Sequence, residues 1–456
     1  MPKKVFIGCG AGFSGDRFDA AIPVIEYLSN CKGAKYLIYE VLGERTIALA
    51  QKEKLKNANL GYSPYLENYL ELVLFKLKKE KIKVITNMGA ANCNAAAKKI
   101  NDIARKMNLS PFKIAVVLGD DILEYHSKNL LNNLSTLEGT KLEGKTIHSA
   151  NVYLGAKSIS DALKEDVDIV LVGRTTDSAL VLGPLIREFH WDLNEYDKLA
   201  FGTICGHLLE CGAQVTGAYF ADPGFKDVSN LENVGFPIAE VNEDGTFIIT
   251  KPKNSGGCVT KATVTEQLLY EMHDPSNYIV PEVVVDINDL KLIEEEKDKI
   301  KVIGVRGKEP TRSLKATVCL DGGWMCEAEM SYSGINALER SKLAGKIVKE
   351  RMRQKGFNGK IRMDIIGASS VFLGENFDFF KDKSIRKNGD FRLRLSLISN
   401  SKKFAQTLAD ELQMLYCSGP AGGGGFRSNI TEEISSASVL LDKNLIDPNI
   451  RIKIYK

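Results

Sequence analysis

The sequence predicts an α/β protein with a Rossmann-like, mainly parallel sheet, helices on both faces, and a smaller C-terminal α+β domain. Short apolar segments rich in β-branched residues alternate with amphipathic, helix-length segments through the first half of the 456-residue chain. This alternation indicates βαβ units and therefore parallel strands. The pattern changes near Pro281, where charged residues and longer strand-like segments begin. We therefore predict two domains, residues 1–280 and residues 281–456.

The expected strands of the first domain are short and apolar, and each runs into a loop that is polar or rich in small residues. They lie at residues 4–8, 35–40, 82–86, 113–118 and 168–172. Amphipathic segments at residues 65–80 and 94–107 are clear examples of the intervening helices. Ligands of open α/β sheets bind beyond the carboxyl ends of the strands, so we expect the site in these loops.

In the second domain, two strand-like segments at residues 315–319 and 325–332 flank an Asp-Gly-Gly sequence, which predicts a hairpin turn at residues 321–323. A helical segment at residues 336–354, two further strands and a second helix at residues 403–416 follow. This order favours a split βαβ arrangement.

Composition excludes several classes of protein. The chain is 44% hydrophobic and 26% charged, as in ordinary globular proteins. Its 61 basic and 58 acidic residues leave a net charge of +3, too small a field to attract nucleic acid or a membrane surface. No apolar run approaches the roughly 18 residues of a membrane span, and the start lacks the features of a secretory signal. The nine scattered cysteines are expected to be reduced thiols, so we expect a cytoplasmic protein. The loops described below lead us to expect a small anionic substrate.

The first loop contains a GxGxxG pattern at residues 10–15, directly after a strand, which is typical of a dinucleotide site for NAD(P). Two residues argue against it: Asp16 would place a carboxylate beside the pyrophosphate, and Pro23 suggests a late helix start. The alternatives are a tight turn capped by Asp16, or a loop whose amides hold another anion. The candidate ligand contacts in this loop are Gly12, Ser14, Gly15, Asp16 and Arg17.

Asparagines follow the strand at residues 82–86. Asn87 and Asn92 are candidates for substrate contact, with helix capping as the alternative.

The densest group of reactive side chains lies at residues 167–217, where an apolar strand ends in Arg174, Thr175, Thr176 and Asp177. The arginine can form a bidentate pair of hydrogen bonds with a carboxylate or phosphate, and the backbone amides after it are further donors. Asp177 is a candidate acid or base, and its alternative role is to stabilise the start of the next helix.

Further along, His207 and Cys211 lie one helical turn apart, with Glu210 beside them. General acid–base chemistry by His207 or Glu210 is the functional interpretation, and buried helix packing is the alternative. The spacing does not match a known structural zinc pattern, so no metal site is predicted.

A second glycine loop precedes a helix and could cradle an anion. Its candidate ligand contacts are Asn254, Ser255, Gly256, Gly257 and Lys261. A run of glycines at residues 422–425 is either a flexible connection or a place of close backbone approach.

Together, the motifs GAGFSGDR, NMGAANCN, GRTTDSALVLGPL, CGHLLECGAQVTG, NSGGCVTKATVTEQLLYEM and GPAGGGG resemble the acyclic terpene utilisation (AtuA) family. The resemblance implies a role in a pathway that degrades branched acids as acyl-CoA thioesters, and it carries no firm catalytic assignment. Longer members of that family carry an extra small domain, which implies a separate small subunit here. Frequent Lys, Ile and Asn indicate a low-GC bacterium, in which fermentation of a small branched acid is the more natural setting.

These observations predict a hydratase or carbon–carbon lyase acting on an acyl-CoA thioester or short carboxylic acid, and a homo-oligomeric assembly. The catalytic candidates are Arg174, Asp177, His207 and Glu210, which supply proton transfer and oxyanion stabilisation. The first alternative is an NAD(P)-dependent oxidoreductase in which Glu40 contacts the ribose. The second is a non-catalytic subunit of a multi-protein acyl-CoA complex.

Overall fold

The computed structural model describes residues 3–368, 370–371 and 388–456 of the chain. It divides into two compact units: unit 1 comprises Met1–Cys319 with Ser436–Lys456, and unit 2 comprises Leu320–Ser435. Both passages between the units fall within strands, β14 (Ser313–Gly334) and β17 (Gly424–Asp442). Residues 281–319 and 436–456 therefore belong to unit 1.

The central strands of unit 1 are parallel and run in the order β1-β2-β3-β6-β4. Their bounds are β1 Lys4–Ala11, β2 Ala34–Tyr39, β3 Lys83–Thr86, β6 Ile169–Leu171 and β4 Ile114–Leu118. Apart from residues at the strand ends, these segments are buried, which explains why their sequences are continuous apolar runs rather than alternating ones.

Antiparallel strands extend this sheet on both sides. They are β7 Ile238–Asn242, β8 Phe247–Thr250, β12 Lys299–Ile303 and β11 Lys291–Glu296 beside β1, and β18 Arg451–Tyr455 beside β4. The predicted α/β class is confirmed, but the ten-stranded sheet is mixed rather than mainly parallel. Hairpin connections, such as the turn at Gly245 between β7 and β8, make neighbouring strands antiparallel, and the alternation of the first half could not reveal them.

Helices follow most of the parallel strands, and the later ones pack around α9. The bounds are α1 Ala21–Ser29, α2 Glu44–Lys56, α3 Leu66–Glu71, α4 Leu74–Glu80, α5 Cys93–Lys106, α6 Lys128–Asn132, α7 Ala156–Leu163, α8 Ala179–Phe189, α9 Tyr196–Glu210, α10 Lys261–Leu269 and α14 Lys443–Ile446. Every residue of α9 from Leu199 to Glu210 is buried, so this helix is enclosed on all sides rather than exposed along one face. Across the residues that the structure describes, no helix combines the length and apolarity needed to cross a membrane.

Shorter strands complete unit 1. β5 (Ile147–Val152) pairs with β14, and a small antiparallel sheet contains β13 (Arg306–Lys308), β10 (Val284–Asp286) and β9 (Tyr278–Ile279). The β9 strand brings Tyr278 beside α9, where its ring lies 5.4 Å from that of His207.

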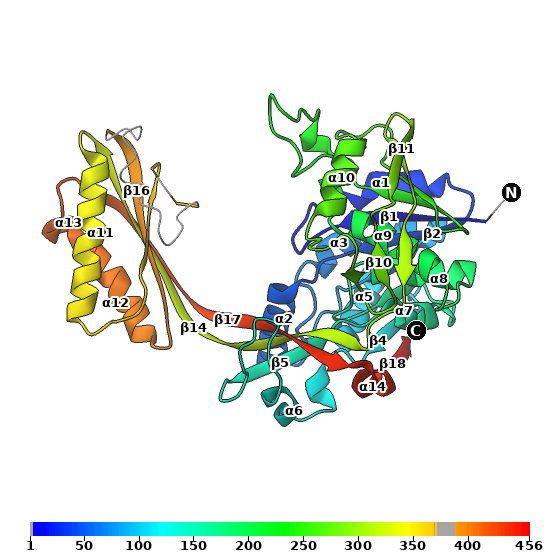
Figure 1. The fold of residues 1–456 in the computed structure, drawn as a ribbon, viewed down its shortest axis with the longest axis horizontal. Helices are drawn as coiled ribbons and strands as arrows, with labels where there is room; N and C mark the ends of the chain where they lie inside the picture. Colours follow the sequence, from blue (N-terminus) through cyan, green and yellow to red (C-terminus); the bar gives the residue numbers. More distant parts are fainter. Residues whose placement is uncertain (1–2, 369, 372–387) are drawn as a thin grey trace. The chain divides into compact units, whose positions relative to one another are not determined.

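Unit 2 is a four-stranded sheet, in the order β15-β16-β14-β17, covered by helices. Its further elements are α11 Ala337–Gln354, β15 Arg362–Ile366, β16 Gly389–Ser399, α12 Lys402–Gln413 and α13 Leu415–Ser418. Figure 1 shows α11 and α12 side by side against this sheet. Alternate residues of β14 and β16, such as Met330 and Leu393, are buried in one apolar cluster with residues of both helices.

The hairpin predicted at residues 321–323 is wrong, because β14 continues through these positions as one strand. A Cβ atom on Gly322 would lie 2.8 Å from the backbone of Glu433, and one on Gly323 would lie 2.7 Å from that of Ser399. The two glycines therefore permit close approach of the neighbouring strands rather than a chain reversal.

Candidate functional site

The site begins at the carboxyl end of β2, where Glu40 is buried. Its Oε1 accepts hydrogen bonds from the amide of Leu42 (2.9 Å) and from Nδ2 of Asn87 (2.8 Å), which follows β3. Asn87 also accepts a bond from the amide of Val41 (2.8 Å), so it fixes the loop that carries the acid. Burial, reinforced by the charge of Asp177, raises the pKa of Glu40 to about 8. Glu40 is therefore a protonated, neutral acid at pH 7.

Arg174 follows β6 and is linked to this acid through the backbone of Leu42. Its guanidinium is 2% exposed, and Nη1 donates to Asp177 Oδ1 (2.8 Å) and to the carbonyl oxygen of Leu42. Burial alone would lower the pKa of Arg174, but nearby negative charge, mainly that of Asp177, raises it. Its Nε is buried and has no hydrogen-bond partner among the described residues. The site thus holds a fixed cation with one unused donor.

An aromatic ring supports the cation from one side. The centre of the Tyr153 ring lies 4.0 Å from Arg174 Cζ and 4.8 Å from Lys315 Nζ. The Tyr153 hydroxyl donates to Glu44, whose carboxylate is also 3.1 Å from Lys315 Nζ. Burial would raise the pKa of Glu44, but the bond from Tyr153 and the charges of Arg174 and Lys315 lower it to about 2. Sequence reasoning missed these three residues, although Tyr153 directly follows a strand, as the predicted site residues do.

Asp120 holds the backbone of this loop. Its Oδ2 accepts bonds from the Arg174 amide and from Asn151 Nδ2, both at 2.9 Å. Burial raises its pKa to about 6 despite these two bonds. Thr175 and Thr176 bond to the neighbouring loop instead: the Thr175 hydroxyl and the Thr176 amide donate to the carbonyl of Leu154.

His207 and Glu210 form a buried pair on α9. His207 Nδ1 is 3.0 Å from Glu210 Oε1, and its Nε2 is 3.1 Å from the carbonyl of Leu268. Burial would lower the pKa of His207, but the bond to Glu210 and the charge of that group raise it, while burial raises the pKa of Glu210 itself. Oε2 of Glu210 is buried and unpartnered among the described residues. The negative charge of Asp177 also acts on Glu210, so this pair belongs to the same group of charges.

Two close backbone approaches bring α9 to the other loops. A Cβ on Gly206 would lie 2.6 Å from Ser178 Cα, next to Asp177, and one on Gly12 would lie 2.3 Å from the backbone carbon of Cys211. Four of the predicted loops therefore converge: those at residues 12–17, 87–92, 174–177 and 207–211. We name the Glu40, Arg174, Asp177 and Glu210 side chains the acid–base cluster.

The first glycine loop is closed by its own carboxylate. Asp16 accepts bonds from the amides of Gly12 (2.9 Å) and Arg17 (2.7 Å). Burial raises the pKa of Asp16, and these two bonds oppose the rise. Arg17 is 2.9 Å from Asp19, and α1 begins only at Ala21. Amides that a bound pyrophosphate would use are thus already occupied.

The remaining predicted residues lie apart from the acid–base cluster. Asn92 caps α5 by accepting from the Ala95 amide (3.2 Å), and its Nδ2 donates to the Ala58 and Leu60 carbonyls. Ser14 lines a cavity whose wall includes Leu42, and Gly15 adopts a positive φ of 92° beside Tyr65.

The amides of the glycine loop at residues 254–257 donate hydrogen bonds to carbonyl oxygens of neighbouring backbone. Gly256 donates to the carbonyl of Asn233 (2.7 Å) and Gly257 to that of Ser229 (2.9 Å). The Ser255 hydroxyl donates to Pro252, while Asn254 and Lys261 are exposed. This loop packs the segment that precedes β7 and presents no free cradle.

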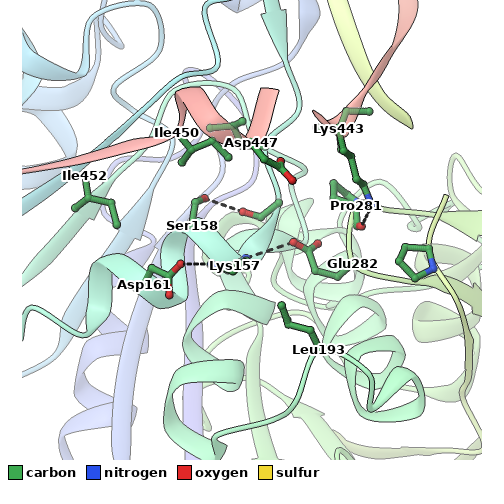
Figure 2. Close-up of a pocket in the computed structure, with 14 residues that line it drawn as sticks. Lys157, Ser158, Asp161, Leu193, Pro281, Glu282, Lys443, Asp447, Ile450 and Ile452 are labelled. Atoms are coloured by element: carbon green, nitrogen blue, oxygen red, sulfur yellow. Dashed lines mark hydrogen bonds and ion pairs between the residues drawn. The ribbon is translucent and has the colours of Figure 1, made fainter. Parts of the chain in front are cut away.

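A second cavity has a volume of about 440 Å³. Figure 2 shows that charged side chains in its lining form hydrogen bonds and ion pairs with one another. Glu282 accepts from the Lys157 amide (3.3 Å) at the start of α7, and Lys157 Nζ is 2.5 Å from Asp161. Lys443 donates to the carbonyl of Pro281 (2.5 Å). None of these residues contacts the acid–base cluster in the hydrogen bonds and ion pairs of the described chain.

Within the described ranges, no three His, Cys, Asp or Glu side chains are grouped so that they could hold a metal ion. No curated protein sequence matches the chain. A family model described as acyclic terpene utilisation family protein AtuA matches residues 5–452. This match covers nearly the whole chain and includes all of the converging loops. The chain belongs to the AtuA family.

Proposed function

We propose that this protein is an enzyme that adds or removes water, or cleaves a carbon–carbon bond, next to the carbonyl group of an acyl-CoA thioester or short carboxylic acid. One observation carries the proposal: the buried Arg174 is ion-paired with Asp177, is linked through the Leu42 backbone to the neutral Glu40, and has an Nε without a partner among the described residues. Two carboxyl groups in different protonation states are the usual arrangement for acid–base catalysis near neutral pH.

Each group has a defined task in a dehydration. Arg174 Nε donates to the carbonyl oxygen of the substrate and stabilises the negative charge that develops there. Asp177 removes the proton from the carbon next to the carbonyl. Glu40 gives its proton to the departing hydroxyl, so that water leaves and a carbon–carbon double bond forms. Hydration is the reverse, and in a lyase the base removes the proton of the substrate hydroxyl instead.

His207 acts as a positioning residue in this scheme. Both of its ring nitrogens are engaged, so it does not reach the substrate, but it holds Glu210 with one carboxylate oxygen free. Membership of the acyclic terpene utilisation family supports a thioester substrate, since branched acids are degraded in that form.

The test is a turnover screen with short and branched hydroxyacyl-CoA and enoyl-CoA esters and the free acids. Wild-type protein should convert at least one, and Asp177→Asn and Glu40→Gln should each lower kcat by about 10²- to 10⁴-fold. Asn254→Ala is the matched control, because Asn254 is exposed and distant from the cluster in the hydrogen-bond network. Failure of wild-type protein to turn over or bind any of these compounds would overturn the proposal.

The alternatives give different results. A nicotinamide-dependent oxidoreductase has the GxGxxG pattern in its favour, but Asp16 occupies the amides of Gly12 and Arg17 in that loop. A non-catalytic subunit would leave pathway flux unchanged in cells that carry Asp177→Asn or Glu40→Gln.

A further inference from the structure

A cavity of about 660 Å³ lies at the carboxyl ends of the first strands of unit 1. Its size falls within the range of roughly 300–1,000 Å³ of small-molecule sites. The walls are mainly apolar and include Val41, Leu42, Leu49 and Tyr65, with Arg45 exposed at the rim. We name it the Ser63 cavity, after the serine that also lines it.

Ser63 is the independent sign of a ligand. Its side chain is only 5% exposed, and its Oγ has no hydrogen-bond partner among the described residues. Its amide already donates to the carbonyl of Met88 (2.9 Å), so the backbone is satisfied and the hydroxyl alone is not. A buried hydroxyl without a partner is destabilising, and an oxygen atom of a bound molecule would relieve it.

The Ser63 cavity and the acid–base cluster meet at one residue, Leu42. The Leu42 amide donates to Glu40 Oε1, and the Leu42 carbonyl accepts from Arg174. Leu42 therefore presents its side chain to the cavity while its backbone joins the two charged groups. Leu42 therefore forms the boundary between the cavity and the groups that we propose to move protons.

We propose that the Ser63 cavity holds the hydrocarbon body of the substrate, an aliphatic acyl compound with an oxygen substituent that hydrogen-bonds to Ser63. This inference rests on the proposed function and specifies its substrate. The apolar walls bind the chain, and Ser63 selects for a hydroxyl or carbonyl oxygen along it, because a chain without oxygen leaves the serine unpaired.

The probes are octanoate and a set of hydroxyoctanoates, titrated calorimetrically into the full-length protein. Wild-type protein should bind at least one hydroxyoctanoate roughly three- to tenfold more tightly than octanoate, the usual effect of one hydrogen bond. Ser63→Ala should abolish this preference and leave octanoate affinity unchanged. Ser149→Ala is the matched control, since Ser149 is another buried serine, on β5, that does not line this cavity.

A second variant tests the apolar wall. Leu49 is 47% exposed, so Leu49→Asp should fold, and its charge should weaken binding of every probe at least tenfold. The inference is overturned if no probe binds, if the preference survives Ser63→Ala, or if Leu49→Asp binds normally. Binding needs no turnover, so probes that bind as expected uphold the cavity even if the turnover screen is negative. If the protein turns over a substrate and its KM is the same in wild type, Ser63→Ala and Leu49→Asp, the inference about the cavity is overturned. The proposed function then still stands.

Discussion

Arg174 Nη1 lies 2.8 Å from Asp177 Oδ1, while Nε of the same guanidinium has no partner among the described residues. The nitrogens of this guanidinium therefore differ: Nη1 holds a carboxylate, whereas Nε is buried and without a partner. Such a fork can bind a substrate oxygen without losing its own counter-ion, which is the role that we propose for Arg174.

Arg174→Met should destabilise the protein by about 3–5 kcal/mol, because Glu44 and Asp177 lose the buried cation that compensates their charge. Denaturant unfolding at pH 7 measures this. Adding Asp177→Asn to the same chain should restore part of the loss, since it removes one of the uncompensated charges. Additive effects of the two changes would contradict the pairing.

Glu40→Gln should stabilise the protein at alkaline pH. Glu40 has a pKa raised to about 8, so the folded state keeps a proton that the unfolded state releases near pH 4.5. The contribution of Glu40 to the free energy of unfolding is therefore complete below about pH 4.5 and is lost as the pH rises towards 8. Gln resembles the protonated acid and can keep the bonds from Leu42 and Asn87. Thermal unfolding from pH 5 to 9 should show a smaller decline for the variant, and parallel curves would refute the raised pKa.

His207→Phe should cost more stability at pH 6 than at pH 9. The pKa of His207 is raised above its usual 6.5 by the bond to Glu210, so the stability that it contributes is present in acid and is lost as the pH rises through the folded value. Glu210→Gln is the control, because it should remove the same pH dependence while keeping a hydrogen bond to the ring. A loss of stability that does not vary with pH would indicate packing alone.

Gly12→Ala should destabilise the fold by about 1–3 kcal/mol or more, because its Cβ would lie 2.3 Å from the backbone of Cys211. Gly424→Ala serves as the matched substitution, since nothing lies within 4 Å of a Cβ there. Equal melting temperatures for the two variants would show that α9 does not press against the first loop.

Saturating NAD or NADP should leave the melting temperature unchanged. Any ligand that binds only the folded state raises it, and the carboxylate of Asp16 occupies the Gly12 and Arg17 amides. A rise that depends on nucleotide concentration, and that disappears in Arg17→Ala, would revive the oxidoreductase alternative.

The sequence predicts where the polar groups gather, because charged residues directly after an apolar strand mark the point where the chain leaves the buried sheet. Arg174 and Asp177 are both predicted in this way, and they do form a pair. For Asn87 the prediction is substrate contact or a helix cap, whereas its side chain bonds to Glu40 and to the backbone of Val41. Contacts between residues far apart in sequence are set by strand order, which local patterns do not encode.

The same limit applies to the sheet and to the glycine loops. Periodicity locates the parallel strands, but β7, β8 and β18 join them through pairings that depend on the whole chain. A glycine-rich loop predicts accessible backbone amides but does not predict what they bind. The Gly12 amide donates to Asp16, and the Gly256 amide donates to the Asn233 carbonyl.

The position of β18 has a consequence for biosynthesis. Residues 451–455 pair with β4, which is made more than half a chain earlier, and Leu320–Ser435 lies between them as an uninterrupted stretch. Since domains form as they leave the ribosome, unit 2 has all its strands before unit 1 has its last one. The edge of β4 therefore stays unpaired during most of translation, and a nascent chain halted after unit 2 would expose an open sheet that chaperones can recognise.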